Sequence, residues 1–74
     1  QQTNTAMKYA PHQQRVVDEF TELNARLAKL EDFIQSNPIF AGLPEAEQGR
    51  MKRQQAAMAE YSQVLRERIA AFSA

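Results

Sequence analysis

Two stretches of this chain carry apolar residues at the spacing of amphipathic helices. In the first, apolar residues recur at alternating steps of four and three positions, at Val16, Phe20, Leu23, Leu27, Leu30 and Ile34. Steps of this kind form a heptad seam, a narrow apolar stripe that packs against a neighbouring helix. Pro11 suits the first position of a helix, whereas Asn37 before Pro38 ends one. The pattern predicts a helix of about 25 residues, or roughly 37 Å, between these two points.

The second stretch has a sparser seam, with one large apolar residue in each heptad and mixed residues between. This seam consists of Met51, Gln55, Met58, Ser62, Leu65, Ile69 and Phe72. Pro44 is suited to begin the helix, and Glu45 and Glu47 place negative charge near the positive end of its dipole. Glycine costs roughly 1 kcal/mol relative to alanine inside a helix. We therefore interpret Gly49 as a position that allows a close approach between helices.

A further stripe runs along the second helix beside this seam. It consists of Gln54, Tyr61 and Arg68, which are seven residues apart. A helix flank that is polar and aromatic does not build a dry core. We therefore expect this stripe to face a partner chain, a ligand or water.

The connection between the two helices is too apolar for a solvated loop. Residues 38–43 include Ile39, Phe40 and Leu43, which we expect to fold back and close this end of the structure. Two long helices and a short connection predict an all-α fold, an antiparallel two-helix hairpin spanning residues 10–74. Residues 1–9 lack apolar periodicity and are predicted to form a flexible N-terminal segment.

The two narrow seams leave apolar residues such as Val17, Phe33 and Val64 off the contact between the helices. A chain of this size buries a modest core, and a single hairpin would leave much of its apolar surface exposed to solvent. We therefore expect a homo-oligomer, a dimer or a higher multiple, in which hairpins combine into a helical bundle.

Composition narrows the classes of function. The 74 residues contain no cysteine and one histidine, which excludes disulfides, thiolate metal sites and sites built from several histidines. Nine basic residues balance nine acidic ones, so no overall charge draws the chain to nucleic acid. The sequence has no apolar stretch near the ~20 residues of a membrane span. We expect a cytoplasmic protein that has no cofactor or metal and does not bind membranes or nucleic acid.

Charged and aromatic residues gather where the two helices would meet at the open end of the hairpin. With the turn centred near residue 40, Arg15 faces Arg66, and Glu19 comes next to Tyr61. The candidate ligand-binding residues are Tyr9, His12, Arg15, Tyr61, Arg66 and Arg68. Two interpretations stay open: carboxylates of both helices hold the arginines in ion pairs, or the cluster binds an anion such as the phosphate of a nucleotide.

The sequence offers no set of residues suited to catalysis. His12 follows a proline at the start of a helix, and no serine, cysteine or second histidine is placed to work with it. Carboxylate neighbours such as Glu31 and Asp32 have the spacing of ordinary solvated helix charges. The prediction is a binding protein and not an enzyme.

Three motifs along the two helices resemble those of a known protein family. The motifs are Pro11-His12-Gln13-x-Arg15-Val16-Val17-x-Glu19, Leu27-x-x-Leu30-x-x-Phe33-Ile34 and Met58-x-x-Tyr61-x-x-x-Leu65-x-x-Arg68-Ile69. They resemble a family of small phage-encoded proteins of tailed phages and prophages, including crAss-like phages, over roughly residues 8–73. The chain departs from the family's pattern at Phe20-Thr21, where relatives often carry a charged residue and alanine, and this adds apolar surface.

Small phage helical hairpins of this kind are similar in architecture to proteins that counter bacterial defence. Some of those oligomerise and sequester cyclic-nucleotide or cyclic ADP-ribose signals between protomers, and others block a defence protein directly. The resemblance implies an anti-defence protein of the host bacterial cytoplasm that sequesters a cyclic nucleotide in pockets of a homo-oligomer. Two alternatives stay open: an inhibitor of a host defence protein, in the manner of an anti-CRISPR, and a structural phage assembly module that only self-associates.

Overall fold

The structure, a computed structural model, describes residues 9–72 and is all-helical over that range. It contains three helices, which are α2 (Pro11–Ser36), α3 (Pro38–Ala41) and α4 (Glu45–Ala71). The prediction of an all-α fold is confirmed. Residues 1–8, most of the segment that we predicted to be flexible, lie outside the described residues.

Local hydrogen bonds and prolines set both ends of α2. Pro11 occupies the first helical position, and the side chain of Gln13 accepts a hydrogen bond of 2.9 Å from the backbone N–H of Ala10. At the other end, Asn37 leaves the helical region, with φ −89° and ψ 122°. This extended conformation is what Pro38 imposes on the residue before it. The bounds agree with those predicted from the sequence.

Helix α3 is a single turn that places Phe40 against the core. The side chain of Asn37 accepts a hydrogen bond of 2.9 Å from the N–H of Ile39 and so caps this turn. Phe40 is buried, and its ring meets Phe33 edge-on at a centroid distance of 6.2 Å. Ile39 is 62% exposed, so the prediction that it folds back was wrong. Ile39 is exposed because a single helical turn can direct only one side toward the core. Phe40 occupies that side, and Ile39 is rotated by about 100° from Phe40.

Helix α4 is tied to the preceding loop by a side chain from its own first turn. The Nε2 group of Gln48 donates hydrogen bonds to the carbonyl oxygens of Leu43, at 2.9 Å, and Ala41, at 3.3 Å. Pro44 stands immediately before the helix, as predicted, and the N–H groups of Glu47 and Gln48 both bond to its carbonyl oxygen. The start of α4 therefore has a fixed position relative to α3.

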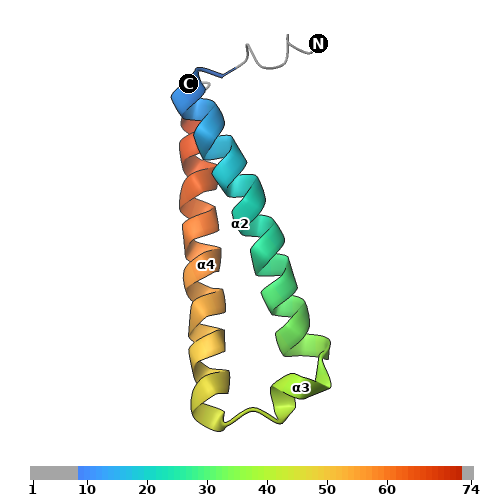
Figure 1. Cartoon of the computed structure of the whole chain (residues 1–74). Helices are drawn as coiled ribbons and strands as arrows, with labels where there is room; N and C mark the ends of the chain where they lie inside the picture. Colours follow the sequence, from blue (N-terminus) through green and yellow to red (C-terminus); the bar gives the residue numbers. More distant parts are fainter. Residues whose placement is uncertain (1–8, 73–74) are drawn as a thin grey trace.

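The two long helices lie side by side and run in opposite directions (Figure 1). They are closest near residues 9 and 72 and diverge toward α3, which fills the wider end. The Cα atoms span 48 × 25 × 14 Å, so the molecule is a slab one helix thick. None of the helices within residues 9–72 is long and apolar enough to cross a membrane.

The core follows the two predicted seams. Leu65 is fully buried, and Val16 and Leu23 pack with it. Around this group lie the half-buried side chains of Phe20, Met58, Ile69 and Phe72. Gly49 does not take part in the contact between helices: a Cβ atom built on it would meet nothing within 4 Å. Within one chain, our interpretation of Gly49 as a point of close approach was therefore wrong.

The register between the helices differs from the one assumed from the sequence. Three pairs of side chains meet across it, namely Phe20 with Arg66, Asn24 with Ser62, and Glu31 with Gln55. Each pair is symmetrical about residue 43, not residue 40. Because α3 carries the chain further along the axis before it turns, α4 is displaced by five residues, or about 7.5 Å. Arg15 therefore comes level with Ala71 and not with Arg66.

Candidate functional site

One edge of the contact between the helices is closed by polar side chains, and we call it the amide edge. The Oγ atom of Ser62 donates a hydrogen bond of 2.7 Å to Oδ1 of Asn24. Two turns along, Nε2 of Gln55 donates to Oε2 of Glu31 at 3.3 Å. Ser62 is buried, at 5% exposed, and its partner Asn24 is half-buried. The amide edge therefore satisfies the polar groups that the sparse seam of α4 brings into the interior.

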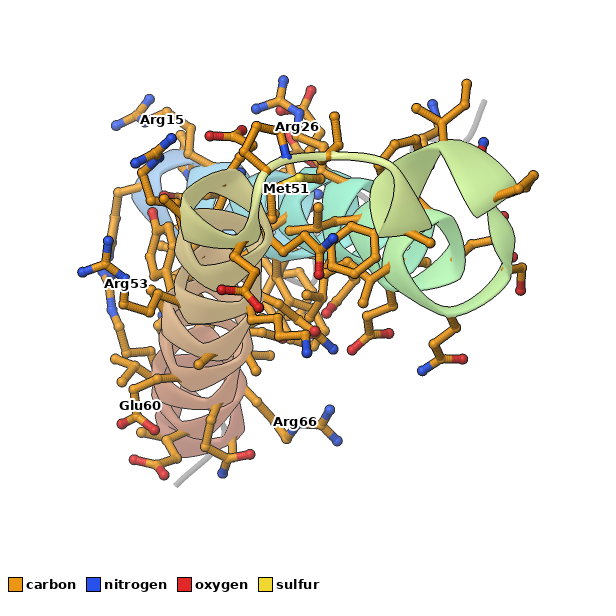
Figure 2. All side chains as sticks on the ribbon, turned by 90° about the horizontal axis from the view of Figure 1, so that it is seen from below. Arg15, Arg26, Met51, Arg53, Glu60 and Arg66 are labelled. Atoms are coloured by element: carbon orange, nitrogen blue, oxygen red, sulfur yellow. The ribbon has the colours of Figure 1, made fainter. Side chains whose placement is uncertain are left out.

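Arg66 lies at the end of the amide edge and contacts α2. Its guanidinium carbon is 5.7 Å from the centre of the Phe20 ring, the geometry of a cation–π contact. Figure 2 shows Arg66 on the opposite side of the molecule from Arg15 and Arg26. The structure thus does not bring Arg66 and Arg15 together, and the predicted single cluster is divided by the register shift.

The opposite edge carries the stripe that we singled out in the sequence, and we call it the tyrosine edge. On α4 it consists of Gln54, Tyr61 and Arg68, all exposed, with Tyr61 at 44%. Tyr61 precedes Ser62 by one residue and is rotated by about 100° from it, which places its ring off the amide edge. On α2 the tyrosine edge continues with Arg15 and Arg26, which lie on the same side in Figure 2.

Arg26 is a residue of the tyrosine edge that the sequence reasoning missed. In the observed register it comes level with Glu60, one residue from Tyr61. The sequence did contain a signal for Arg26, which is its spacing from Arg15. The two are eleven residues apart, about three helical turns, so their side chains leave α2 on the same side. The edge therefore presents arginines from both long helices beside an exposed aromatic ring.

The arginines of both edges are not held in ion pairs by the residues that the structure describes. Over residues 9–72 the one salt bridge joins Arg50 to Glu47, at 2.8 Å. Two of the carboxylates that could have paired with them accept hydrogen bonds from neighbouring glutamines instead, Asp18 from Gln14 and Glu67 from Gln63. The interpretation of a salt-bridged cluster thus does not describe this arrangement.

The remaining two candidates lie at the end where the helices converge. His12 is exposed in the first turn of α2 and makes no hydrogen bond within the described part of the chain. Tyr9 is half-buried, and its ring packs edge-on against Phe72 at a centroid distance of 6.1 Å. Tyr9 therefore has a packing contact of its own, whereas His12 remains available at the surface.

The exposed groups of the tyrosine edge can bind an anion and an aromatic ring. Within residues 9–72 no group of acidic or histidine side chains is arranged to hold a metal ion, and no pocket is enclosed. Guanidinium groups supply forked donors that match phosphate, and a phenol ring supplies a stacking surface for a base. The tyrosine edge combines both on one open side of the molecule.

The chain was compared with known families, curated proteins and solved structures. The model of the Sequestin family matches residues 10–71, which include all three helices. Neither the curated proteins nor the solved structures gave a match. Because the matched region covers far more than half of the sequence, the chain belongs to the Sequestin family.

Proposed function

We propose that this chain is a phage-encoded anti-defence protein that binds a cyclic-nucleotide immune signal between the chains of a homo-oligomer. The family's name, Sequestin, is consistent with a protein that sequesters a signal. The observation that carries the proposal is the tyrosine edge: Tyr61 and Arg68 are exposed on α4, and Arg26 of α2 comes level with Glu60, one residue from Tyr61. Such a protein acts by stoichiometric binding in the cytoplasm of the bacterial host and needs no catalytic group.

The two kinds of side chain suit the two parts of a nucleotide. Arg26 comes level with Glu60, about 12 Å along the axis from Arg68, so the two would contact separate phosphate groups of the signal. Such charge-assisted hydrogen bonds contribute about 1.5–3 kcal/mol each. The ring of Tyr61 would stack on the base, which contributes about 1–3 kcal/mol. Because these arginines are free of ion pairs in the described chain, binding would not first have to break one.

The oligomer would convert this open edge into a pocket. A single chain is 14 Å thick between its Cα extremes, so it presents the tyrosine edge as an open surface. Val64, 41% exposed and about one turn from Tyr61, adds an apolar group beside the ring. A second chain over this region would cover Val64 and surround the ligand, which supports binding between protomers.

Isothermal titration calorimetry of the assembled protein, with a panel of cyclic mononucleotides, cyclic dinucleotides and cyclic ADP-ribose, tests the proposal. We expect at least one member to bind, and Tyr61→Ala and Arg68→Gln each to weaken binding about tenfold or more. Lys29→Gln is the matched control, since Lys29 is an exposed cation on the outer side of α2, and it should leave binding unchanged. If no member of the panel gives a heat of binding, the proposal is wrong.

A second candidate is an inhibitor that binds a host defence protein, and the neighbouring exposed side chains of Tyr61 and Val64 favour it. An aromatic and an aliphatic group together on a helix surface are typical of the centre of a protein interface. Affinity capture from host lysate separates the two candidates. A partner that is captured by the natural chain and lost with Tyr61→Ala, without any nucleotide binding, would favour the inhibitor.

If substitutions of the arginines change only the stability of the oligomer, the chain is a structural module.

A further inference from the structure

The side of α4 that points away from α2 is exposed along its whole length. We call this the outer face of α4, and it consists of Gly49, Arg53, Ala56, Ala57, Glu60 and Val64, all exposed. Figure 2 shows Arg53 and Glu60 projecting from α4 on the side away from α3. No other part of the described chain covers this face. Three of its six residues are glycine or alanine, and its two charges have opposite signs.

The two charges on the outer face cannot satisfy each other within one chain. Arg53 and Glu60 are seven residues apart, which is two turns or about 10.5 Å along the helix. Neither is in an ion pair within the described residues. A second α4 that lies antiparallel to the first would bring each Arg53 against the partner's Glu60, and so form the pair twice. A parallel second copy at the same level would place like charges together.

The same antiparallel arrangement accounts for two other features of the outer face. Arg53 and Glu60 are symmetrical about the midpoint between Ala56 and Ala57, and so are Gly49 and Val64. Val64 is 41% exposed, and a Cβ atom at Gly49 would meet nothing within 4 Å. The side chain of Val64 would therefore lie over the open surface at the partner's Gly49. The two alanines at the midpoint allow the helix axes to come close.

We propose that two copies of this chain form a two-fold dimer through the outer faces of their α4 helices, centred between Ala56 and Ala57. The proposal rests on the homo-oligomer of the proposed function, but it does not depend on the ligand. The outer side of α2 also has opposite charges seven residues apart, at Glu22 and Lys29. There the same arrangement would place Asp32 of one chain level with the partner's Glu19, and Asp18 one residue from the partner's Asp32, which disfavours it.

The dimer also adds residues of the partner to the tyrosine edge. A two-fold axis perpendicular to the antiparallel helices keeps the tyrosine edges of both chains on one side of the dimer. The partner's Gln54 then comes level with Ala59, which is two residues, or about 3 Å along the helix axis, from Tyr61. The alanines at the midpoint would form the floor of a shallow groove between two such edges. The ligand-binding site is therefore a composite of both chains.

Charge reversal tests the register by sedimentation equilibrium. We expect the natural chain to dimerise or to form a multiple of dimers, and Arg53→Glu or Glu60→Arg alone to raise the dissociation constant at least tenfold. The double variant Arg53→Glu/Glu60→Arg should return it to within about threefold, because the reversed charges meet again. Glu22→Lys and Lys29→Glu on α2 are the matched controls and should have no effect. A monomeric natural chain, or single variants that dimerise normally, would overturn the proposal.

A cross-linking experiment tests the same dimer without reversing charges. The chain has no cysteine, so a single introduced thiol can form a disulfide only with its own copy. Ala57→Cys lies beside the two-fold axis, where Cα atoms of the two chains come within the ~4.4–6.8 Å of a disulfide, and it should oxidise to a covalent dimer. Ala46→Cys, on the same helix, lies roughly 31 Å from its copy and should not. Equal cross-linking of both variants would contradict the arrangement, whatever calorimetry with nucleotides shows.

Discussion

Replacement of Leu65 by alanine tests whether the seam between α2 and α4 holds the chain together. Leu65 is fully buried and contacts the cluster around Val16 and Leu23. Leu→Ala substitutions at buried sites cost about 2–5 kcal/mol, the sum of lost transfer free energy and the cavity left behind. A chain of this length has a total stability of roughly 4–11 kcal/mol. The substitution therefore removes from about a fifth to all of the free energy of unfolding.

Thermal and urea unfolding, followed by circular dichroism at the helix band, measure this loss. A cost of about 3 kcal/mol corresponds to a fall in Tm of roughly 12–24 °C for a domain of this size. Ile39→Ala removes the same number of carbon atoms from a side chain that is 62% exposed, and it should cost less than about 1 kcal/mol. If Leu65→Ala melts within a few degrees of the natural chain, or no lower than Ile39→Ala, the core is not where we place it.

Three further predictions concern the polar contacts, the glycine and the divided cluster of arginines. Ser62→Ala should cost about 1 kcal/mol, and a double-mutant cycle with Asn24→Ala should show coupling of at least about 0.5 kcal/mol in urea unfolding. Gly49→Ala, measured in the Arg53→Glu background to keep the chain monomeric, should stabilise α4 by about 0.5–1 kcal/mol, since the added methyl group meets open space. A lower Tm for this variant would contradict the geometry. Arg66→Gln should retain nucleotide binding, because Arg66 lies on the amide edge; loss of calorimetric heat would place the site there instead.

The positions that are buried could be predicted from the sequence, because a heptad repeat marks one side of a helix whatever lies opposite. Val16, Leu23 and Leu27 are buried in α2, and Leu65 in α4, all on the predicted seams. The exposed stripe of Gln54, Tyr61 and Arg68 was also identified from its seven-residue spacing. These features depend on local periodicity alone.

The register could not be predicted, because it depends on the path of the eight residues 37–44 between α2 and α4. We interpreted Asn37 and Pro38 only as the end of α2, although asparagine followed by proline is also a strong signal for the start of a helix. That second helix, α3, displaces α4 along the axis and separates Arg66 from Arg15. The same displacement of α4 brings Arg26 level with Glu60 and so into the candidate site.

The position of the Tyr9–Phe72 contact has a consequence for how the chain folds. This contact joins the first and last described residues, whereas those around α3, such as Phe33 with Phe40 and Gln48 with Leu43, close short segments. The entropic cost of closing a loop grows with its length, so the short segments close first. The Tyr9–Phe72 contact is therefore the last to form, and amide hydrogen exchange should be fast in the final turn of α4 beside Phe72 and slow around the buried Leu65.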